Sequence, residues 1–292
     1  MYAIDRAVRC VPSGGPRMPT AAKRHRQRTI AHALIAASLF VLSANVSLAE
    51  RQLTDDERAI DDPRVQHRSY NFGGPGGEKI PYAIFVPSTY DAAQPAPLLV
   101  SLHGLGRTYD WLMGYQGMLD LAERDGFVVV TPLGYVRRGW YGTYRSRVTA
   151  ETAHRSEADV MNVVGIVRKD FSIDPDRVYL WGHSMGGAGT YHLGAKHPNL
   201  WAGLCVVAPA PLQDIAALDK IKHLPILVLQ GDRDRLAIPT RRWVARMKEL
   251  GIQHVYVEVP GGDHSLFISK DPKMMARVFD FFKVIGKRRR DG

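Results

Sequence analysis

The chain has 292 residues, of which 45% are hydrophobic, and 39 Lys and Arg against 29 Asp and Glu give a net charge of +10. Residues 1–49 hold seven of the basic residues and one of the acidic residues, which leaves +4 for residues 50–292. A further basic run, KRRR, lies near the C-terminal end at 287–290. The charge therefore does not indicate a nucleic-acid-binding face. With Cys10 in the first segment, only Cys205 remains, which excludes an intramolecular disulfide in residues 50–292.

Residues 1–49 have the pattern of a secretory signal peptide. A basic run at 23–28 precedes an almost wholly apolar stretch at 30–49, and small residues lie three and one positions before residue 50. The alternative is a transmembrane anchor, because the apolar stretch is only slightly short for a span. We expect cleavage after residue 49, a secreted or periplasmic product without stable membrane insertion, and one domain over residues 50–292.

Short apolar runs alternate with helical patterns over most of the remaining chain. Two strands around the turn GGPGG are expected to form an antiparallel hairpin, at 65–72 and 80–86. The further expected strands are 98–103, 127–131, 177–182, 203–208, 225–230 and 254–259. The expected helices are 109–125, 157–170, 185–196, 240–250 and 273–285. This alternation predicts an α/β fold with a mostly parallel central sheet, helices on both faces, and a ligand site at the carboxyl ends of the strands.

The sequence Gly182-His183-Ser184-Met185-Gly186 fits the pattern G-x-S-x-G, and it lies between a predicted strand and a predicted helix. That context is typical of a nucleophile elbow, in which the serine lies on a sharp turn at the carboxyl end of a strand. The two glycines are expected to relieve crowding in the turn. The alternative is an ordinary glycine turn, against which the flanking strand and helix argue.

A serine hydroxyl needs a base within hydrogen-bond reach and an acid that orients the base. In this architecture the acid and then the base follow the serine along the chain. His264, in the sequence PGGDHS, follows the last predicted strand and is the expected base. Asp234 follows the preceding strand and is the expected acid, with Asp232 as the alternative. Asp263, next to the base, is expected to be a turn residue.

An oxyanion intermediate needs two preset hydrogen-bond donors. One is expected to be the N–H of Met185, which follows the nucleophile at the start of a helix. The other is expected to be the N–H of Leu105, in the loop sequence HGLG after the strand at 98–103. The chain shows no metal-ligand spacing and no dinucleotide or phosphate-binding fingerprint, so no metal or cofactor is expected.

Taken together, these motifs resemble those of the α/β-hydrolases, and among them the secreted esterases related to polyhydroxybutyrate depolymerases and feruloyl esterases. The resemblance spans about residues 65–285 and rests on LLVSLHGLG, IDPDRVYLWGHSMGGAGT, HPNLWAG, PILVLQGDRD and PGGDHS. It implies acyl transfer to water through a serine ester, with Ser184, Asp234 and His264 at the triad positions. In relatives the acid is commonly followed by a hydrophobic residue and then a proline, with the proline four residues after the acid. Here Pro239 lies five residues after Asp234, which leaves the choice of acid open.

The family also suggests where the substrate is bound. Many members carry a lid between the sixth and seventh core strands, but here only residues 209–224 lie there, which predicts an open site without a large lid. The longer loop, 132–156, carries Trp140 and Tyr141, which could stack on an aromatic acyl group or pack onto the domain instead.

The expected function is therefore that of a secreted serine esterase acting on a small-molecule or polymeric ester. The sequence does not specify the acyl or alcohol group. Two alternatives remain, a serine peptidase of the same fold and a non-catalytic binding protein on a hydrolase scaffold.

Overall fold

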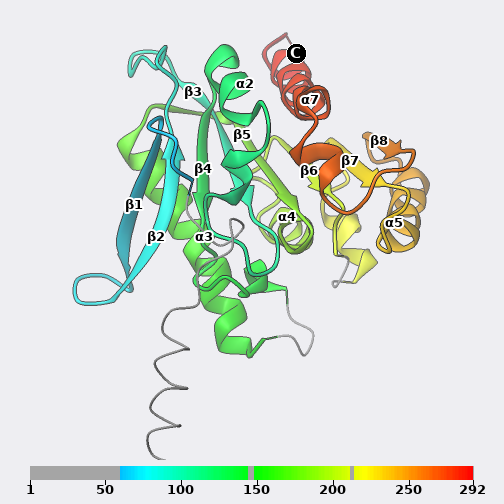
Figure 1. Cartoon of the computed structure of the whole chain (residues 1–292), viewed down its shortest axis with the longest axis horizontal. Coiled ribbons are helices and arrows are strands. Elements are labelled where there is room, and N and C mark those ends of the chain that lie inside the picture. The colour runs from blue at the N-terminus through cyan, green and yellow to red at the C-terminus, as the bar shows by residue number, and fades with distance from the viewer. Residues whose placement is uncertain (1–59, 144–147, 211–213, 292) are drawn as a thin grey trace, which may run out of the picture. The chain divides into compact units, whose positions relative to one another are not determined.

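An eight-stranded sheet in the order β1-β2-β4-β3-β5-β6-β7-β8 organises the fold (Figure 1). The computed structural model describes residues 60–143, 148–210 and 214–291, and the predicted signal peptide lies outside these ranges. The strands are β1 Val65–Phe72, β2 Glu78–Phe85, β3 Ala96–Leu102, β4 Val128–Pro132, β5 Ile173–His183, β6 Gly203–Val207, β7 Ile226–Gly231 and β8 His254–Val259. β2 pairs antiparallel with β1 and β4, and all the other pairs are parallel. The predicted hairpin and mostly parallel sheet are confirmed.

Helices cover both faces of the sheet, because successive side chains of each strand point to opposite faces. Along β3, Leu98 and Val100 belong to one hydrophobic core and Leu99 belongs to the other. The first core is covered by α3 Ala150–Asp170, α4 Met185–Lys196 and α5 Ala237–Glu249. The second is covered by α2 Met118–Asp125, α6 Leu266–Ser269 and α7 Pro272–Asp291. Among the described residues three short 3-10 helices lie in loops, η2 Trp111–Gly114, η3 Trp140–Gly142 and η4 Ile215–Lys220.

The single helix predicted at 109–125 is wrong. In the structure η2 ends at Gly114, Tyr115 is extended, and Gly117 precedes α2 with a φ of 85°. Such a left-handed conformation interrupts a helix and favours glycine. Tyr115 lies in this interruption and is buried, with an exposed fraction of 4%.

The helix predicted from residue 157 begins seven residues earlier, at Ala150. Its N-cap is Thr149, whose side chain accepts a hydrogen bond from the Thr152 N–H. The loop after β4 is accordingly shorter than the predicted 132–156. Between β6 and β7 the described residues form only the short helix η4.

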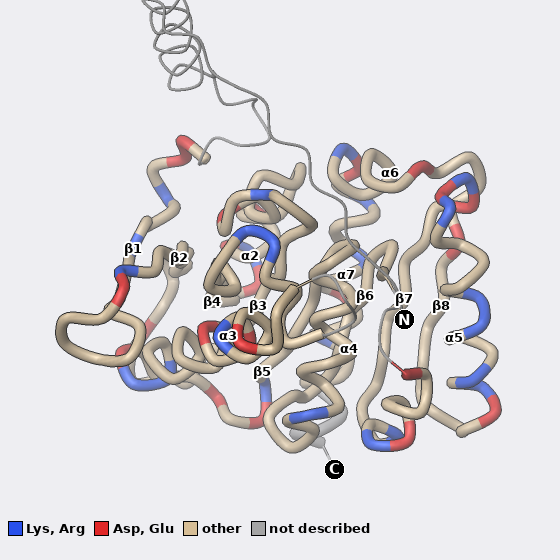
Figure 2. The backbone as a smooth tube through the Cα atoms, turned by 90° about the horizontal axis from the view of Figure 1, so that it is seen from below, with Lys and Arg blue, Asp and Glu red and all other residues tan. Residues whose placement is uncertain are grey.

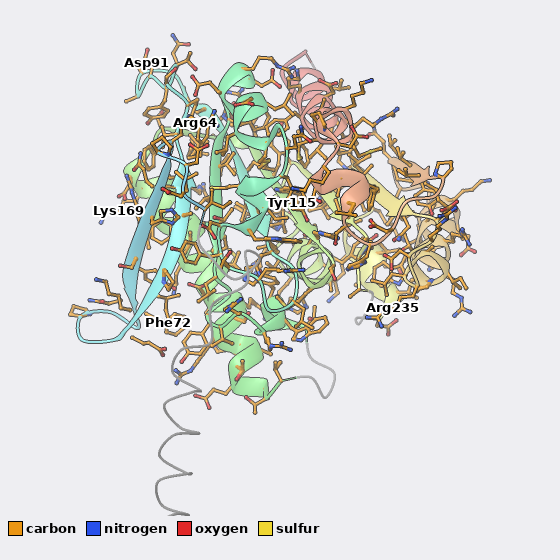
Figure 3. All side chains as sticks on the ribbon, viewed as in Figure 1. Arg64, Phe72, Asp91, Tyr115, Lys169 and Arg235 are labelled. Atoms are coloured by element: carbon orange, nitrogen blue, oxygen red, sulfur yellow. The ribbon has the colours of Figure 1, made fainter. Side chains whose placement is uncertain are left out.

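Lys and Arg positions are mixed with Asp and Glu positions along the chain (Figure 2). Asp91 and Lys169 lie at the periphery of the ribbon, whereas Tyr115 lies near its middle (Figure 3). Within the described ranges, no helix combines the length and the apolar character needed to cross a membrane.

Candidate active site

A single residue, Ser184, separates β5 from α4. Its backbone has a φ of 58° and a ψ of −111°, in a region that side chains strongly disfavour. The turn is held by β6 and the segment after it, because the Ser184 N–H donates to the Val207 carbonyl at 2.9 Å and its own carbonyl accepts from the Ala210 N–H at 3.0 Å. Ser184 is partly exposed, unlike the residues on either side of it. The sequence pattern thus folds into the sharp strand-to-helix turn that it predicts.

The glycines that flank the serine leave no room for a side chain. A Cβ atom at Gly182 would lie 2.3 Å from the Gly186 carbonyl oxygen, and one at Gly186 would lie 1.8 Å from the Leu102 carbonyl oxygen. Both distances are far below van der Waals contact. The prediction that these glycines relieve crowding in the turn is confirmed.

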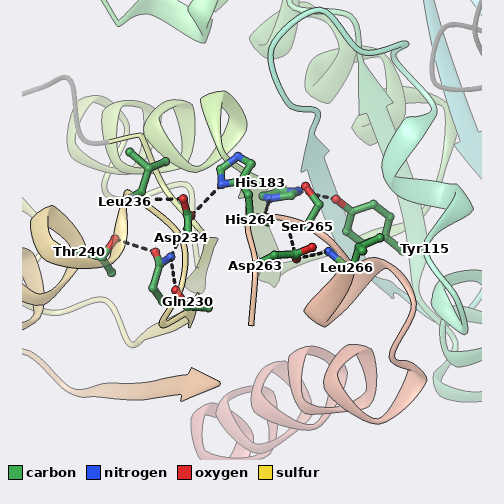
Figure 4. A network of polar contacts seen from close by, with 11 residues as sticks. Tyr115, His183, Gln230, Asp234, Leu236, Thr240, Asp263, His264, Ser265 and Leu266 are labelled. Carbon is green, nitrogen blue, oxygen red and sulfur yellow. Dashed lines mark hydrogen bonds and ion pairs between the residues drawn. The ribbon is translucent and has the colours of Figure 1, made fainter. Parts of the chain in front are cut away.

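The expected base and acid, His264 and Asp234, are hydrogen bonded to each other (Figure 4). The Nδ1–H of His264 donates to Asp234 Oδ2 at 2.7 Å. The same carboxylate accepts from Gln230 Nε2 at 2.9 Å and from the Leu236 N–H at 3.1 Å. Burial alone would raise the pKa of Asp234, but the hydrogen bonds, led by that from His264, lower it. Asp234 is therefore ionised at neutral pH, and the pairing leaves His264 Nε2 to accept a proton.

The two neighbouring aspartates have other partners. Asp232 Oδ1 accepts from the Gly261 N–H at 2.7 Å. Asp263 Oδ1 accepts from the N–H groups of Ser265 and Leu266, at 2.9 Å and 2.7 Å. Both carboxylates thus brace the loop that carries the base, and the structure brings Asp234 rather than Asp232 to the His264 ring.

The base lies against the elbow through the residue before the serine. His183 Nε2 is 2.7 Å from the His264 carbonyl oxygen, and the centres of the two imidazole rings are 5.0 Å apart. In the part of the chain that the structure describes, no hydrogen bond joins the Ser184 hydroxyl to His264. Catalytic hydrogen bonds are often long in the absence of substrate, and the serine hydroxyl can rotate about its Cα–Cβ bond.

The loop after β3 carries Leu105, one of the two expected oxyanion donors. The next two amides are engaged, since the Gly106 N–H donates to Arg137 O at 2.9 Å and the Arg107 N–H donates to Gly104 O at 3.1 Å. The Leu105 N–H donates to no backbone carbonyl of the described residues. The other expected donor, Met185, is the first residue of α4. A paired role for these two amides stays a prediction.

Trp140 and Tyr141, the expected substrate-binding aromatics, form η3 and are buried, with exposed fractions of 7% and 0%. The Tyr141 hydroxyl donates to the His103 carbonyl at 3.3 Å. Its ring packs on α4 so closely that a Cβ atom at Gly189 would lie 2.7 Å from the Tyr141 Cδ2. Tyr141 therefore supports the loop at 103–106 from the interior, and direct contact of either aromatic with substrate stays a prediction.

Two buried residues of the site were not singled out by the sequence analysis. Gln230 is the polar last residue of the apolar run PILVLQ, and a polar residue there could have signalled a partner for the acid. His183 occupies the variable position of the elbow motif and is fully buried, which the motif alone does not reveal.

Comparison with known proteins places the chain among hydrolases. The Esterase family model matches residues 76–268. A bifunctional acetylxylan esterase/xylanase of Neocallimastix patriciarum is 31% identical over 152 residues, which are 52% of this chain and 21% of that protein. The chain spans about a fifth to about a half of the length of the curated relatives that it matches.

Solved structures share the fold at lower identity. A ferulic acid esterase superimposes with a TM-score of 0.59 at 16% identity, covering 76% of this chain and 98% of that chain. An S-formylglutathione hydrolase from Agrobacterium tumefaciens superimposes with a TM-score of 0.59 at 19% identity, covering 77% and 95% of the two chains. The predicted α/β-hydrolase fold is confirmed.

Proposed function

The chain belongs to the Esterase family, and we propose that it hydrolyses carboxylic esters through an acyl-enzyme formed on Ser184. The observation that carries this proposal is the hydrogen bond between His264 and Asp234, made by a histidine that also contacts His183, the residue before the strained Ser184. A neutral imidazole oriented by an ionised carboxylate is the arrangement that activates a serine hydroxyl.

In the proposed reaction the Ser184 oxygen attacks the ester carbonyl while His264 Nε2 takes the hydroxyl proton. The Asp234 carboxylate stabilises the imidazolium that forms. The N–H groups of Leu105 and Met185 stabilise the negative charge on the carbonyl oxygen. The imidazolium then gives its proton to the leaving alcohol. A water molecule then gives a proton to the same imidazole while its oxygen attacks the acyl carbon. The bond from the acyl carbon to the Ser184 oxygen breaks, and the imidazolium returns the proton to that oxygen, which releases the acid and restores the serine.

Replacing the serine tests the mechanism directly. Ser184→Ala is expected to abolish hydrolysis of p-nitrophenyl acetate and labelling by a fluorophosphonate probe while its circular dichroism stays unchanged. A folded Ser184→Ala protein that keeps its activity would refute the assignment. If wild-type protein is labelled but cleaves a nitroanilide as fast as the matched nitrophenyl ester, it is a peptidase; if it is not labelled, it is a binding protein.

The surface of the site supports an ester with apolar groups as the substrate. Four of the six large hydrophobic side chains that are exposed among the described residues follow the carboxyl ends of strands β3, β4, β7 and β8; they are Leu105, Val136, Ile238 and Leu266. Exposed apolar side chains gathered at one edge favour contact with an apolar ligand. We expect kcat/KM to rise along p-nitrophenyl esters from acetyl to octanoyl. A flat or falling series would contradict an apolar contact.

The proposal includes secretion, which rests on the sequence pattern of residues 1–49. Expression of the full chain in a bacterial host with an export pathway is expected to yield a periplasmic or secreted protein that begins at Glu50. N-terminal sequencing measures this, and an uncleaved membrane-bound product would favour an anchor instead.

A further inference from the structure

A line of hydrogen bonds runs through the proposed base and continues beyond it. Gln230 donates to Asp234, and the same carboxylate accepts from His264. The line then follows the backbone of His264, whose carbonyl oxygen lies 2.7 Å from His183 Nε2. The other ring nitrogen of His183, Nδ1, is hydrogen bonded to the hydroxyl of Tyr115. Figure 4 shows these side chains in a row that joins the β7 side of the site to the segment carrying Tyr115.

The partners of His183 determine which nitrogen carries its hydrogen. A carbonyl oxygen can only accept, so Nε2 of His183 is the protonated nitrogen and donates to the His264 carbonyl. In a neutral ring Nδ1 is then an acceptor, and the Tyr115 hydroxyl donates to it. Burial, and next the neighbouring His264, lower the pKa of His183 to about 3, which keeps the ring neutral at neutral pH.

Packing also fixes the His183 ring in place. The side chain is fully buried, and its ring stacks on Trp111 with the ring centres 5.4 Å apart and the planes 14° apart. Tyr115 packs edge-on against the same indole, with ring centres 5.1 Å apart. The ring therefore has one position, set by the η2 segment, from which to meet the loop of the base.

We propose that His183 is a positioning residue for ester hydrolysis, and that its Nε2–H holds the backbone of His264 beside the nucleophile elbow. The inference rests on the proposed function of Ser184. The two histidines are 81 positions apart in sequence, and this hydrogen bond ties the residue next to the nucleophile to the residue that takes its proton. The Asp234 hydrogen bond orients the His264 ring, whereas the His183 hydrogen bond fixes the position of the His264 backbone that carries this ring.

Loss of this hydrogen bond is expected to slow the chemical step more than substrate binding. Misplacement of a catalytic group by about 1 Å can cost about 100-fold in rate. His183→Leu fills the space without a donor, so we expect kcat for p-nitrophenyl acetate to fall about 100-fold while KM changes less than about threefold. A purely structural role for His183 would not produce that split in a folded protein.

A pair of amide variants makes the test specific for the donor. In His183→Gln the side-chain amide nitrogen can reach the place of Nε2 and donate to the His264 carbonyl. In the shorter His183→Asn the amide nitrogen reaches only the place of Nδ1, so it cannot donate to that carbonyl. We expect His183→Gln to keep kcat within about tenfold of wild type, and His183→Asn to behave like His183→Leu. Circular dichroism and thermal unfolding select the folded variants.

The outcomes separate this inference from the proposed function. Wild-type protein that neither turns over esters nor reacts with a fluorophosphonate refutes the esterase proposal itself. If wild type is active, a folded His183→Leu protein with wild-type kcat overturns the positioning role. Equal loss in folded Gln and Leu variants overturns it as well. Should Leu and Asn fail to fold, His183→Gln decides alone, and a folded Gln variant slowed about 100-fold refutes the inference.

Discussion

The strained backbone at Ser184 predicts that the protein becomes more stable when this residue is replaced by glycine than when it is replaced by alanine. Both variants lose the hydroxyl, so their difference isolates the Cβ atom. At a φ of 58° and a ψ of −111° a side chain costs about 1–3 kcal/mol. Removing the side chain therefore stabilises the folded state, but glycine also makes the unfolded chain more flexible, which offsets about 0.5–1 kcal/mol of that stabilisation. We expect Ser184→Gly to exceed Ser184→Ala by about 1 kcal/mol in free energy of unfolding, which is about 2–4 °C in Tm for a domain of this size.

Urea unfolding followed by tryptophan fluorescence measures this difference on residues 50–292. A matched control is Ala245→Gly, which makes the same Ala-to-Gly change at an exposed position within α5. At this position glycine should lower the free energy of unfolding by about 1 kcal/mol relative to alanine, because the helical backbone is unstrained. If Ser184→Gly is no more stable than Ser184→Ala while the control behaves as expected, the turn is not strained and the reasoning from its backbone angles fails.

Three further predictions concern the acid, a glycine of the elbow and a buried carboxylate of α3. Asp234→Asn should lower kcat by about 10⁴-fold, because an amide can hold the wrong tautomer of the base, whereas Asp232→Asn should cost less than about tenfold; comparable losses in ester turnover would leave the acid unassigned. Gly186→Ala should leave little soluble protein, since the added methyl meets the Leu102 carbonyl at 1.8 Å, and a stable variant by thermal unfolding would contradict this geometry. Burial raises the pKa of Glu157, but hydrogen bonds from His192 and Lys196 lower it to about 2. The ionised carboxylate therefore stabilises the folded state fully above pH 4.5, and this stabilisation is lost as the pH falls from there toward 2. Glu157→Gln should flatten that part of the curve of unfolding free energy against pH.

The sequence predicts the sheet well because burial on both faces leaves a plain pattern. Strands such as β3 and β7 are continuous apolar runs with turn residues at their ends, which periodicity identifies. The beginning of α3 was missed because its first turns, AETAHRS, are mostly polar and carry no apolar stripe. The break at Gly117 was missed because a single glycine within a helical pattern does not show whether the backbone turns left-handed there.

The sequence points to the residues of the candidate site but not to all of their contacts. The elbow motif and the order of acid and base along the chain point to Ser184, Asp234 and His264. The choice between Asp232 and Asp234 depends on how the loop after β7 turns, and residues two apart at one strand end cannot be separated by spacing. The burial of Tyr141 could not be predicted either, because the sequence pattern of a loop aromatic is the same whether its side chain faces substrate or the interior.

The distribution of backbone strain gives an independent reason to place the chemistry at the carboxyl edge of the sheet. All five non-glycine residues with positive φ among the described positions follow β4, β5 or β6; they are Tyr135, Trp140, Tyr141, Ser184 and Ala208. Left-handed glycines lie at both edges of the sheet, Gly126 and Gly251 just before β4 and β8, and Gly106 and Gly134 just after β3 and β4. Glycine would serve the turns at the carboxyl edge at lower conformational cost. Non-glycine residues keep these conformations although the strain costs about 1–3 kcal/mol each, so their surrounding contacts must hold them in place. Such strain is typical of sites where geometry matters more than stability.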